Sequence, residues 1–234
     1  MTHSDFIHAP AQPDAKVGKL PTPRDAMVLT AAQWLPQRGM AAVNLIEVAR
    51  AVNAPRGSIY HYFPGGRDQL LQEALALAGK SGLRIIEKAL RSAMAAGVAG
   101  GTDSAKALGA TPKSAMEAFV SAMFSTGPLQ MHASHLSGGC PVGAAVLSSE
   151  TESADFQPIL QAIFASWQAA LVSAFMSLGA VSQAQAGQWA RCTLIAYEGA
   201  LVCAKAEHDP LAAADTFDLA ARMVVQLLNA PPNQ

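Results

Sequence analysis

The sequence predicts an all-α protein, and three observations lead to that prediction. Hydrophobic residues make up 51% of the 234 residues, but only 6% of the residues are aromatic, and alanine is the dominant side chain. No stretch alternates valine, isoleucine or threonine with polar residues as a half-buried strand does. Apolar residues instead recur every three or four positions, which is the spacing of one face of a helix, and we expect about nine helices.

We expect three regions along the chain: a tail over 1–20, a helix-turn-helix domain over 21–66 and a larger helical domain over 67–234. The tail is rich in proline, alanine and polar residues and lacks the charged start and apolar core of a signal peptide. The chain contains no run of eighteen apolar residues, so no membrane partner is expected and a cytoplasmic location is predicted.

Three short helices are expected in the first domain. The first starts near Pro23, and Pro36 should end or distort it before Gly39 supplies a stop. Asn44 is a good N-cap for the second, and Glu47 stands three residues later, where it can complete a capping box. A tight turn, "NAPRG", then leads into the third helix, "SIYHYF".

The second domain should consist of longer helices. A flexible connection is expected over 97–112, and a break is expected near residues 127 and 128. The helices are expected over 67–96, 113–135, 141–152, 155–178, 182–207 and 210–229, the second of them in two parts.

Two short helices joined by a tight turn make a helix-turn-helix, whose second helix enters the major groove of DNA. Ile59 and Phe63 are four residues apart and should point inward, which leaves the side chains between them for DNA. Arg56 can donate two hydrogen bonds to one guanine. The predicted DNA-binding residues are Asn44, Arg56, Gly57, Ser58, Tyr60, His61, Tyr62 and Arg67.

The charge distribution points the same way. Residues 16–91 contain eleven lysines and arginines against five acids, and residues 92–234 contain five against ten. A basic first third is typical of a surface that faces nucleic acid, although these charges can also simply solvate helices.

The segment "RDAMVLTAAQWLPQRGMAAVNLIEVARAVNAPRGSIYHYFPGGRDQLLQEAL" resembles the DNA-binding domain of the TetR family of bacterial transcriptional regulators. With "GGCPVGAAVLSSE" downstream, it further resembles the LmrA/YxaF-like branch. The resemblance implies a homodimer, formed through residues 182–207 and 210–229, that binds a palindromic operator in double-stranded DNA. It also implies a small-molecule effector in the second domain that releases the protein from DNA, usually as a repressor.

The effector pocket is harder to predict from sequence. Its candidate lining suits a flat or apolar effector, since ligand pockets are mainly apolar with a few polar anchors. Core packing is the alternative interpretation of each residue. The candidates are Met116, Phe119, Met123, Phe124, His132, His135, Cys140, Pro141, Val142, Phe164, Trp167 and Trp189.

Other functions stay open at this stage. Cys140 could sense oxidants or electrophiles, if its thiol had a lowered pKa. An enzyme would have to use His132, His135 or Cys140, but the sequence contains no nucleophile–base–acid set and no phosphate loop, so no enzymatic activity is expected. Neither a cofactor nor a metal site is expected. A helical dimer that does not bind DNA would leave the pattern from Arg56 to Arg67 unexplained.

Overall fold

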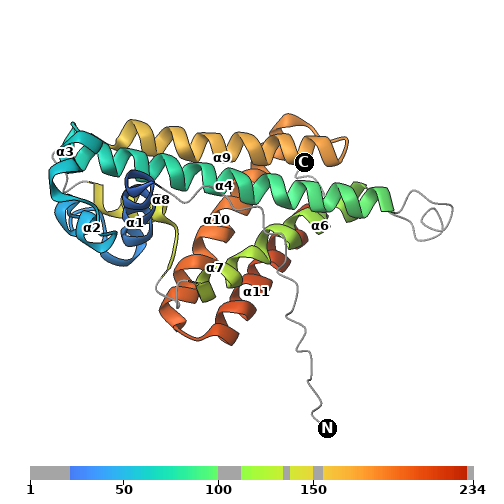
Figure 1. Ribbon diagram of the computed structural model, residues 1–234. Coiled ribbons are helices and arrows are strands. Elements are labelled where there is room, and N and C mark those ends of the chain that lie inside the picture. Colours follow the sequence, from blue (N-terminus) through green and yellow to red (C-terminus); the bar gives the residue numbers. More distant parts are fainter. Residues whose placement is uncertain (1–21, 100–111, 134–137, 150–154, 231–234) are drawn as a thin grey trace, which may run out of the picture.

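The computed structural model describes residues 22–99, 112–133, 138–149 and 155–230. Every element in these ranges is an α-helix or a 3-10 turn, and the described residues contain no strand, so the predicted all-α fold is confirmed. The helix-turn-helix lies at one end of the molecule and the remaining helices form a larger body beside it (Figure 1).

The first domain contains α1 (Pro23–Arg38), α2 (Leu45–Ala51), the 3-10 turn η1 (Arg56–Ser58) and α3 (Ile59–Tyr62). A capping box starts α1, because the Thr22 side chain accepts from the Asp25 amide and the Asp25 side chain accepts from the Thr22 amide. Asn44 caps α2 as predicted, and its Oδ1 accepts from the amides of Ile46 and Glu47.

The sequence predicts that Pro36 ends or distorts α1 and that Gly39 stops it. Pro36 does not end the helix, and the stop at Gly39 is confirmed. The helix continues to Arg38, with Pro36 buried in its last turn, and ends at Gly39, whose φ is 72°. Proline lacks the amide that would bond back along the helix, and the burial of its ring offsets part of that cost. The Lys205 side chain donates to the Pro36 carbonyl, so a cation satisfies the end of the helix.

The second domain follows the predicted order of helices. The break expected near residues 127–128 falls slightly earlier, at Ser125. The helix expected over 141–152 ends at Ser148. Residues 150–152 and most of 97–112 lie outside the described residues. The helices are α4 (Gly66–Ala99), α6 (Pro112–Phe124), α7 (Thr126–Ala133), α8 (Pro141–Ser148), α9 (Gln157–Leu178), α10 (Gln183–Glu207) and α11 (Pro210–Asn229).

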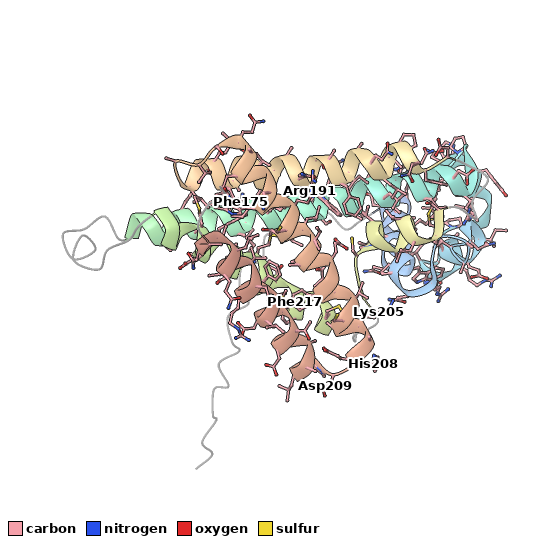
Figure 2. All side chains as sticks on the ribbon, turned by 180° about the vertical axis from the view of Figure 1, so that it is seen from behind. Phe175, Arg191, Lys205, His208, Asp209 and Phe217 are labelled. Atoms are coloured by element: carbon pink, nitrogen blue, oxygen red, sulfur yellow. The ribbon has the colours of Figure 1, made fainter. Side chains whose placement is uncertain are left out.

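The long helices α4 and α9 run side by side, and α10 crosses behind them to pair with α11 (Figure 1). Figure 2 shows His208 and Asp209 at the turn where α10 passes into α11. His208 adopts the left-handed conformation that ends α10, and Asp209 caps α11 through its Oδ1 atom.

Two glycines let aromatic rings approach helix backbones closely. A Cβ atom added to Gly82 of α4 would lie 2.6 Å from the Trp167 ring, and one added to Gly127 of α7 would lie 2.1 Å from the Phe217 ring. The Trp167 indole also donates to the Gly79 carbonyl at 2.8 Å. These close contacts attach α9 to α4 and α11 to α7.

Within the described residues, α9 is the one helix that is long and apolar enough to cross a membrane, judged by length and composition alone. The core helix of a soluble protein passes the same test, so this observation is weak evidence for a membrane. The buried side chains of α9 include Leu160, Ile163, Trp167 and Leu171, and α9 packs against α4 and α10.

Candidate DNA interface and ligand cavity

The third helix divides its side chains between core and solvent as the sequence predicts. Ile59 is 3% exposed and Phe63 is fully buried, whereas Tyr60 is 66% exposed. His61 is also exposed, and Tyr62 is partly buried against the core. Tyr60 and His61 can therefore contact a partner without disturbing the packing of α3.

The turn between α2 and α3 is held by a Schellman motif. The Ala54 amide donates to the Ala49 carbonyl at 2.9 Å, and the Asn53 amide donates to the Arg50 carbonyl at 3.2 Å. Asn53 has a φ of 53°, a left-handed conformation that asparagine tolerates better than most residues. This turn fixes the direction in which the chain enters α3.

Arg24 attaches the start of α1 to the end of α3. Its Nε atom donates to the Tyr62 carbonyl at 3.3 Å, and its guanidinium lies 5.1 Å from the centre of the Phe63 ring. Its Nη2 atom lies 2.6 Å from Glu73 of α4. Arg24 therefore contributes to the structure of the domain and orients α3 between two longer helices.

Arg67 has a similar structural role. Its Nε atom donates to the Val43 carbonyl at 2.8 Å, and its Nη2 atom donates to the Met40 carbonyl. The guanidinium thus stabilises the loop before α2. Contact between Arg67 and a phosphate stays a prediction.

The positive balance of the first third is not concentrated at α3. Lys80, Arg84, Lys88 and Arg91 are exposed along α4, which extends away from the helix-turn-helix (Figure 1). Arg24 and Arg67 contact protein groups. The excess of positive charge in the first third of the sequence is therefore weak evidence for a DNA surface, because much of that charge lies away from α3 or contacts protein groups.

A cavity of about 700 Å³ lies between the two domains. Its walls come from α1, α4, α6, α7, α9, α10, the start of α8 and the segment that leads into it. Most of its surface is apolar, with Trp34, Ile85, Ile86 and Trp167 among the larger groups. The polar side chains that line it are Gln33, Gln37, Ser81, Gln130, Cys140, Tyr197 and Glu198.

Three of these polar groups lie together. The Cys140 sulfur accepts from the Gly143 amide at 3.2 Å, which caps α8, and the Cys140 thiol donates to the Glu198 carboxylate. The Tyr197 hydroxyl lies 3.1 Å from Thr126 Oγ1. The start of α8 and the middle of α10 thus form one polar corner of the cavity.

Burial controls the ionisation of this corner. Burial raises the pKa of the Cys140 thiol far above its ordinary value, and the adjacent Glu198 charge raises it further. Burial also raises the pKa of Glu198, and the hydrogen bond from Cys140, which lowers this pKa, offsets the increase only in part. Burial raises the pKa of Tyr197 to about 12. A thiol held in its protonated form is a poor nucleophile, which argues against Cys140 as a redox or electrophile sensor.

Comparison with known proteins places this geometry in a family. Residues 28–74 match the family described as "Bacterial regulatory proteins, tetR family", and residues 112–216 match "Transcriptional regulator LmrA/YxaF-like, C-terminal domain". The chain belongs to the TetR family, in its LmrA/YxaF-like branch. It is a TetR-family transcriptional regulator with an N-terminal helix-turn-helix domain.

Individual relatives agree with this assignment. YxaF of Bacillus subtilis, an uncharacterized HTH-type transcriptional regulator, is 28% identical over 158 residues, which cover 67% of this chain and 71% of YxaF. An uncharacterized HTH-type transcriptional regulator of Mycobacterium tuberculosis is 48% identical over 67 residues, which cover 29% of this chain. That match spans 34% of the length of the mycobacterial protein.

Solved structures show the same fold. The regulatory protein TetR from Rhodobacter sphaeroides has a TM-score of 0.64 at 20% identity, covering 86% of this chain and 96% of its own. A TetR transcriptional regulator from Legionella pneumophila has a TM-score of 0.65 at 13% identity, covering 91% of this chain and 99% of its own.

The cavity of this TetR-family chain contains four of the twelve predicted ligand-binding residues: Met123, Cys140, Pro141 and Trp167. The others that can be placed do not line it and lie in or against the hydrophobic core, namely Met116, Phe119, Phe124, Val142, Phe164 and Trp189. His135 and the side chain of His132 lie outside the described part of the chain. No group of three possible metal ligands occurs among the described residues.

Sequence reasoning missed the contributions of α1 and α4 to the cavity, and from α10 it named Trp189 but not Tyr197 or Glu198. One signal was available for α10, because Glu198 is a single charge within the otherwise apolar or small-residue stretch "TLIAYEGALVCA". No comparable signal marks Gln33, Trp34 or Gln37 of α1, since the period of α1 predicts only that one of its faces is buried.

Proposed function

We propose that this TetR-family protein is a ligand-responsive repressor that binds a palindromic operator as a homodimer and is released by a small effector. Family membership and the exposed face of α3 support DNA binding. In this proposal α3 enters the major groove, Arg56 and His61 contact base edges, and Tyr60 and Tyr62 contact phosphates, together with Asn44, Gly57, Ser58 and Arg67.

The observation that carries the ligand response is the shared wall of the cavity. Leu29, Gln33, Trp34 and Gln37 belong to α1 of the helix-turn-helix domain, and they line the same cavity as α4 and α10. An effector bound there contacts both domains at once. If it fits better when α1 has moved away from its DNA-bound position, it shifts the population of the protein away from the operator.

The homodimer is proposed to form through α10 and α11. These helices expose apolar side chains that a folded monomer would otherwise bury: Ile195 is 65% exposed, Val202 is 63% exposed and Leu211 is 79% exposed. Leu219 and Met223 of α11 are exposed as well. Two such helix pairs can form a four-helix bundle, which would set the spacing of the two α3 helices.

Fluorescence anisotropy with the DNA upstream of its own gene tests the first part of the proposal. We expect specific binding that weakens steeply as salt rises, because phosphate contacts release counterions. A folded dimer with no sequence preference at low salt would refute the proposal. Val202→Asp should give a monomer in sedimentation and lose operator binding, because two buried carboxylates would face each other across the bundle.

Arg56→Ala separates base contact from phosphate contact. Loss of a bidentate contact to guanine should cost about 1–3 kcal/mol of binding free energy and relax the preference at one position of each half-site. The measurement is a competition assay with operator variants at that position. Equal weakening on every sequence would show that Arg56 contacts a phosphate instead.

A further inference from the structure

The cavity between the domains contains a carboxyl group that has no cationic partner within the described part of the chain. Among the described residues that line it, Glu198 is the one with a carboxyl group, and lysine, arginine and histidine are absent from them. No ion pair forms between Glu198 and the rest of the described chain. The carboxyl faces an apolar space in which water solvates a charge poorly.

The neutral groups around Glu198 stabilise its charge only in part. The Cys140 thiol donates one hydrogen bond, and thiols are weak donors. The other polar side chains on the walls are Gln33 and Gln37 of α1, Ser81 of α4, Gln130 of α7 and Tyr197 of α10, all uncharged. A carboxylate in such a place takes up a proton or pairs with a cation, because leaving it charged and alone is costly.

The first turn of α8 leaves room for the carboxyl. A Cβ atom added to Gly143 would lie 3.0 Å from Glu198 Oε2 and 3.3 Å from the Cys140 Cβ atom. The backbone at Gly143 does not have the positive φ that requires glycine, so space is the reason for the small residue. The "GGCPVG" segment therefore both donates to Glu198 and allows it to lie against the start of α8.

The large side chains on the walls from α1, α4 and α9 are apolar or aromatic. Trp34 of α1, Trp167 of α9 and Ile85 and Ile86 of α4 supply most of the large surfaces, and the charged group lies on the α10 side. A ligand that matches both parts has an aromatic or aliphatic ring system and one polar end. A cavity of about 700 Å³ is large enough for a drug-sized molecule of this kind.

We propose that the cavity binds an aromatic cation, whose protonated nitrogen pairs with the Glu198 carboxylate while its ring system packs between α1, α4 and α9. This inference rests on the proposed effector role of the cavity and names the chemical class of the effector. In the absence of a ligand, a proton or a water molecule stabilises the Glu198 carboxyl group. The protonated nitrogen of the ligand would take that place. An amine, an amidine or a ring nitrogen that is protonated at neutral pH meets the requirement.

Isothermal titration calorimetry on the full-length dimer without DNA tests the class of ligand. The two probes are 2-naphthylmethylamine, which is a cation at neutral pH, and 2-naphthylmethanol, which has nearly the same shape and no charge. We expect the amine to bind at least about tenfold more tightly than the alcohol, because a charge-assisted hydrogen bond is stronger than a neutral one. Equal affinities of the two probes would overturn the inference.

Two variants link that preference to the carboxyl. Glu198→Gln keeps the shape of the side chain and should lower the affinity for the amine about tenfold while leaving that for the alcohol unchanged. Gly143→Ala should lower the preference by a smaller factor, because it displaces Oε2 by a few tenths of an ångström. Glu87→Gln removes an exposed charge from α4 and should change neither affinity. An amine affinity that Glu198→Gln leaves intact would overturn the inference.

The pH dependence supplies an independent readout. Between about pH 5 and 8 the amine stays protonated, and Cys140 and Tyr197 stay neutral because burial raises the pKa of both. Affinity for the amine should therefore rise with pH as Glu198 loses its proton, and affinity for the alcohol should not. A flat profile for the amine contradicts the pairing.

The DNA-release assay separates this inference from the proposed function. If the amine binds through Glu198 but leaves the protein on its operator, the effector role fails and the ligand class stands. If a neutral compound releases the protein from DNA while the amine does not bind, the ligand class fails and the effector role stands.

Discussion

The outer face of α3 and the polar corner of the cavity both offer polar groups to a partner, but they differ in what surrounds those groups before the partner arrives. Tyr60 is 66% exposed, so water satisfies its hydroxyl. Glu198 lies in an apolar cavity and depends on Cys140 and on its own protonation. Substitutions on the α3 face should therefore change binding alone, whereas substitutions at the cavity should change stability and binding together.

The largest expected effect separates the two sides of α3. Phe63→Ala should lower the free energy of unfolding by about 3–5 kcal/mol, because the ring is fully buried and its loss leaves a cavity. Tyr60→Ala lies on the exposed face, so its free energy of unfolding should stay within about 0.5 kcal/mol of that of the wild type. It should still weaken operator binding. Urea unfolding and anisotropy measure the two quantities. A large loss of stability for Tyr60→Ala would remove the distinction between the faces.

The cavity wall should respond to Gly82→Ala by a smaller amount. The added methyl group would overlap the Trp167 ring at 2.6 Å and disturb the hydrogen bond to Gly79, at a cost of about 1–3 kcal/mol. Gly187→Ala in α10 is the matched control, since nothing lies within 4 Å of its added Cβ, and it should stabilise the protein by up to about 1 kcal/mol. Thermal unfolding compares the melting temperatures of the two variants. Equal changes in melting temperature would show that Trp167 moves aside at little cost.

Asn44 lies on the DNA side but also has a structural role. Asn44→Ala should lower the free energy of unfolding by about 1 kcal/mol, because the amides of Ile46 and Glu47 lose their acceptor. Asn44→Asp keeps the cap but adds a negative charge near the phosphates. If Asn44 contacts DNA, that variant should unfold like the wild type and bind the operator more weakly in anisotropy. Unchanged DNA affinity would leave Asn44 as a cap alone.

The smallest expected effect concerns the pH dependence of stability at Glu198. Its folded-state pKa is raised by burial above the usual 4.5, so in the pH range between these two values the folded state binds more protons than the unfolded state. The contribution of Glu198 is therefore complete below pH 4.5 and is lost as pH rises through the folded pKa. The melting temperature of the wild type should fall relative to that of Glu198→Gln across this range. A constant difference would mean that the carboxyl is well solvated.

Local signals in the sequence predicted most helix boundaries. Asn44 caps α2, the Asp209–Pro210 pair starts α11, and Pro141 starts α8, because each effect depends on neighbouring residues alone. At Pro36 the helix was expected to end or be distorted, and it does not end there. The local cost of the proline favours a break, but burial of its ring and the Lys205 contact from α10 stabilise the last turn, and neither can be read from the neighbouring sequence.

The sequence by itself determined the all-α class, the order of the helices, the division of α3 into buried and exposed side chains, and the family, because these depend on short-range periodicity and on one compact motif. Tertiary structure alone decided that Arg24 and Arg67 bind protein groups, and that α1, α4, α8 and α10 enclose a common cavity. It also brought Glu198 to Cys140, fifty-eight positions earlier in the chain, with Gly143 leaving the space. The position of one helix against another depends on how several apolar faces pack at once, and no single stretch of sequence contains that information.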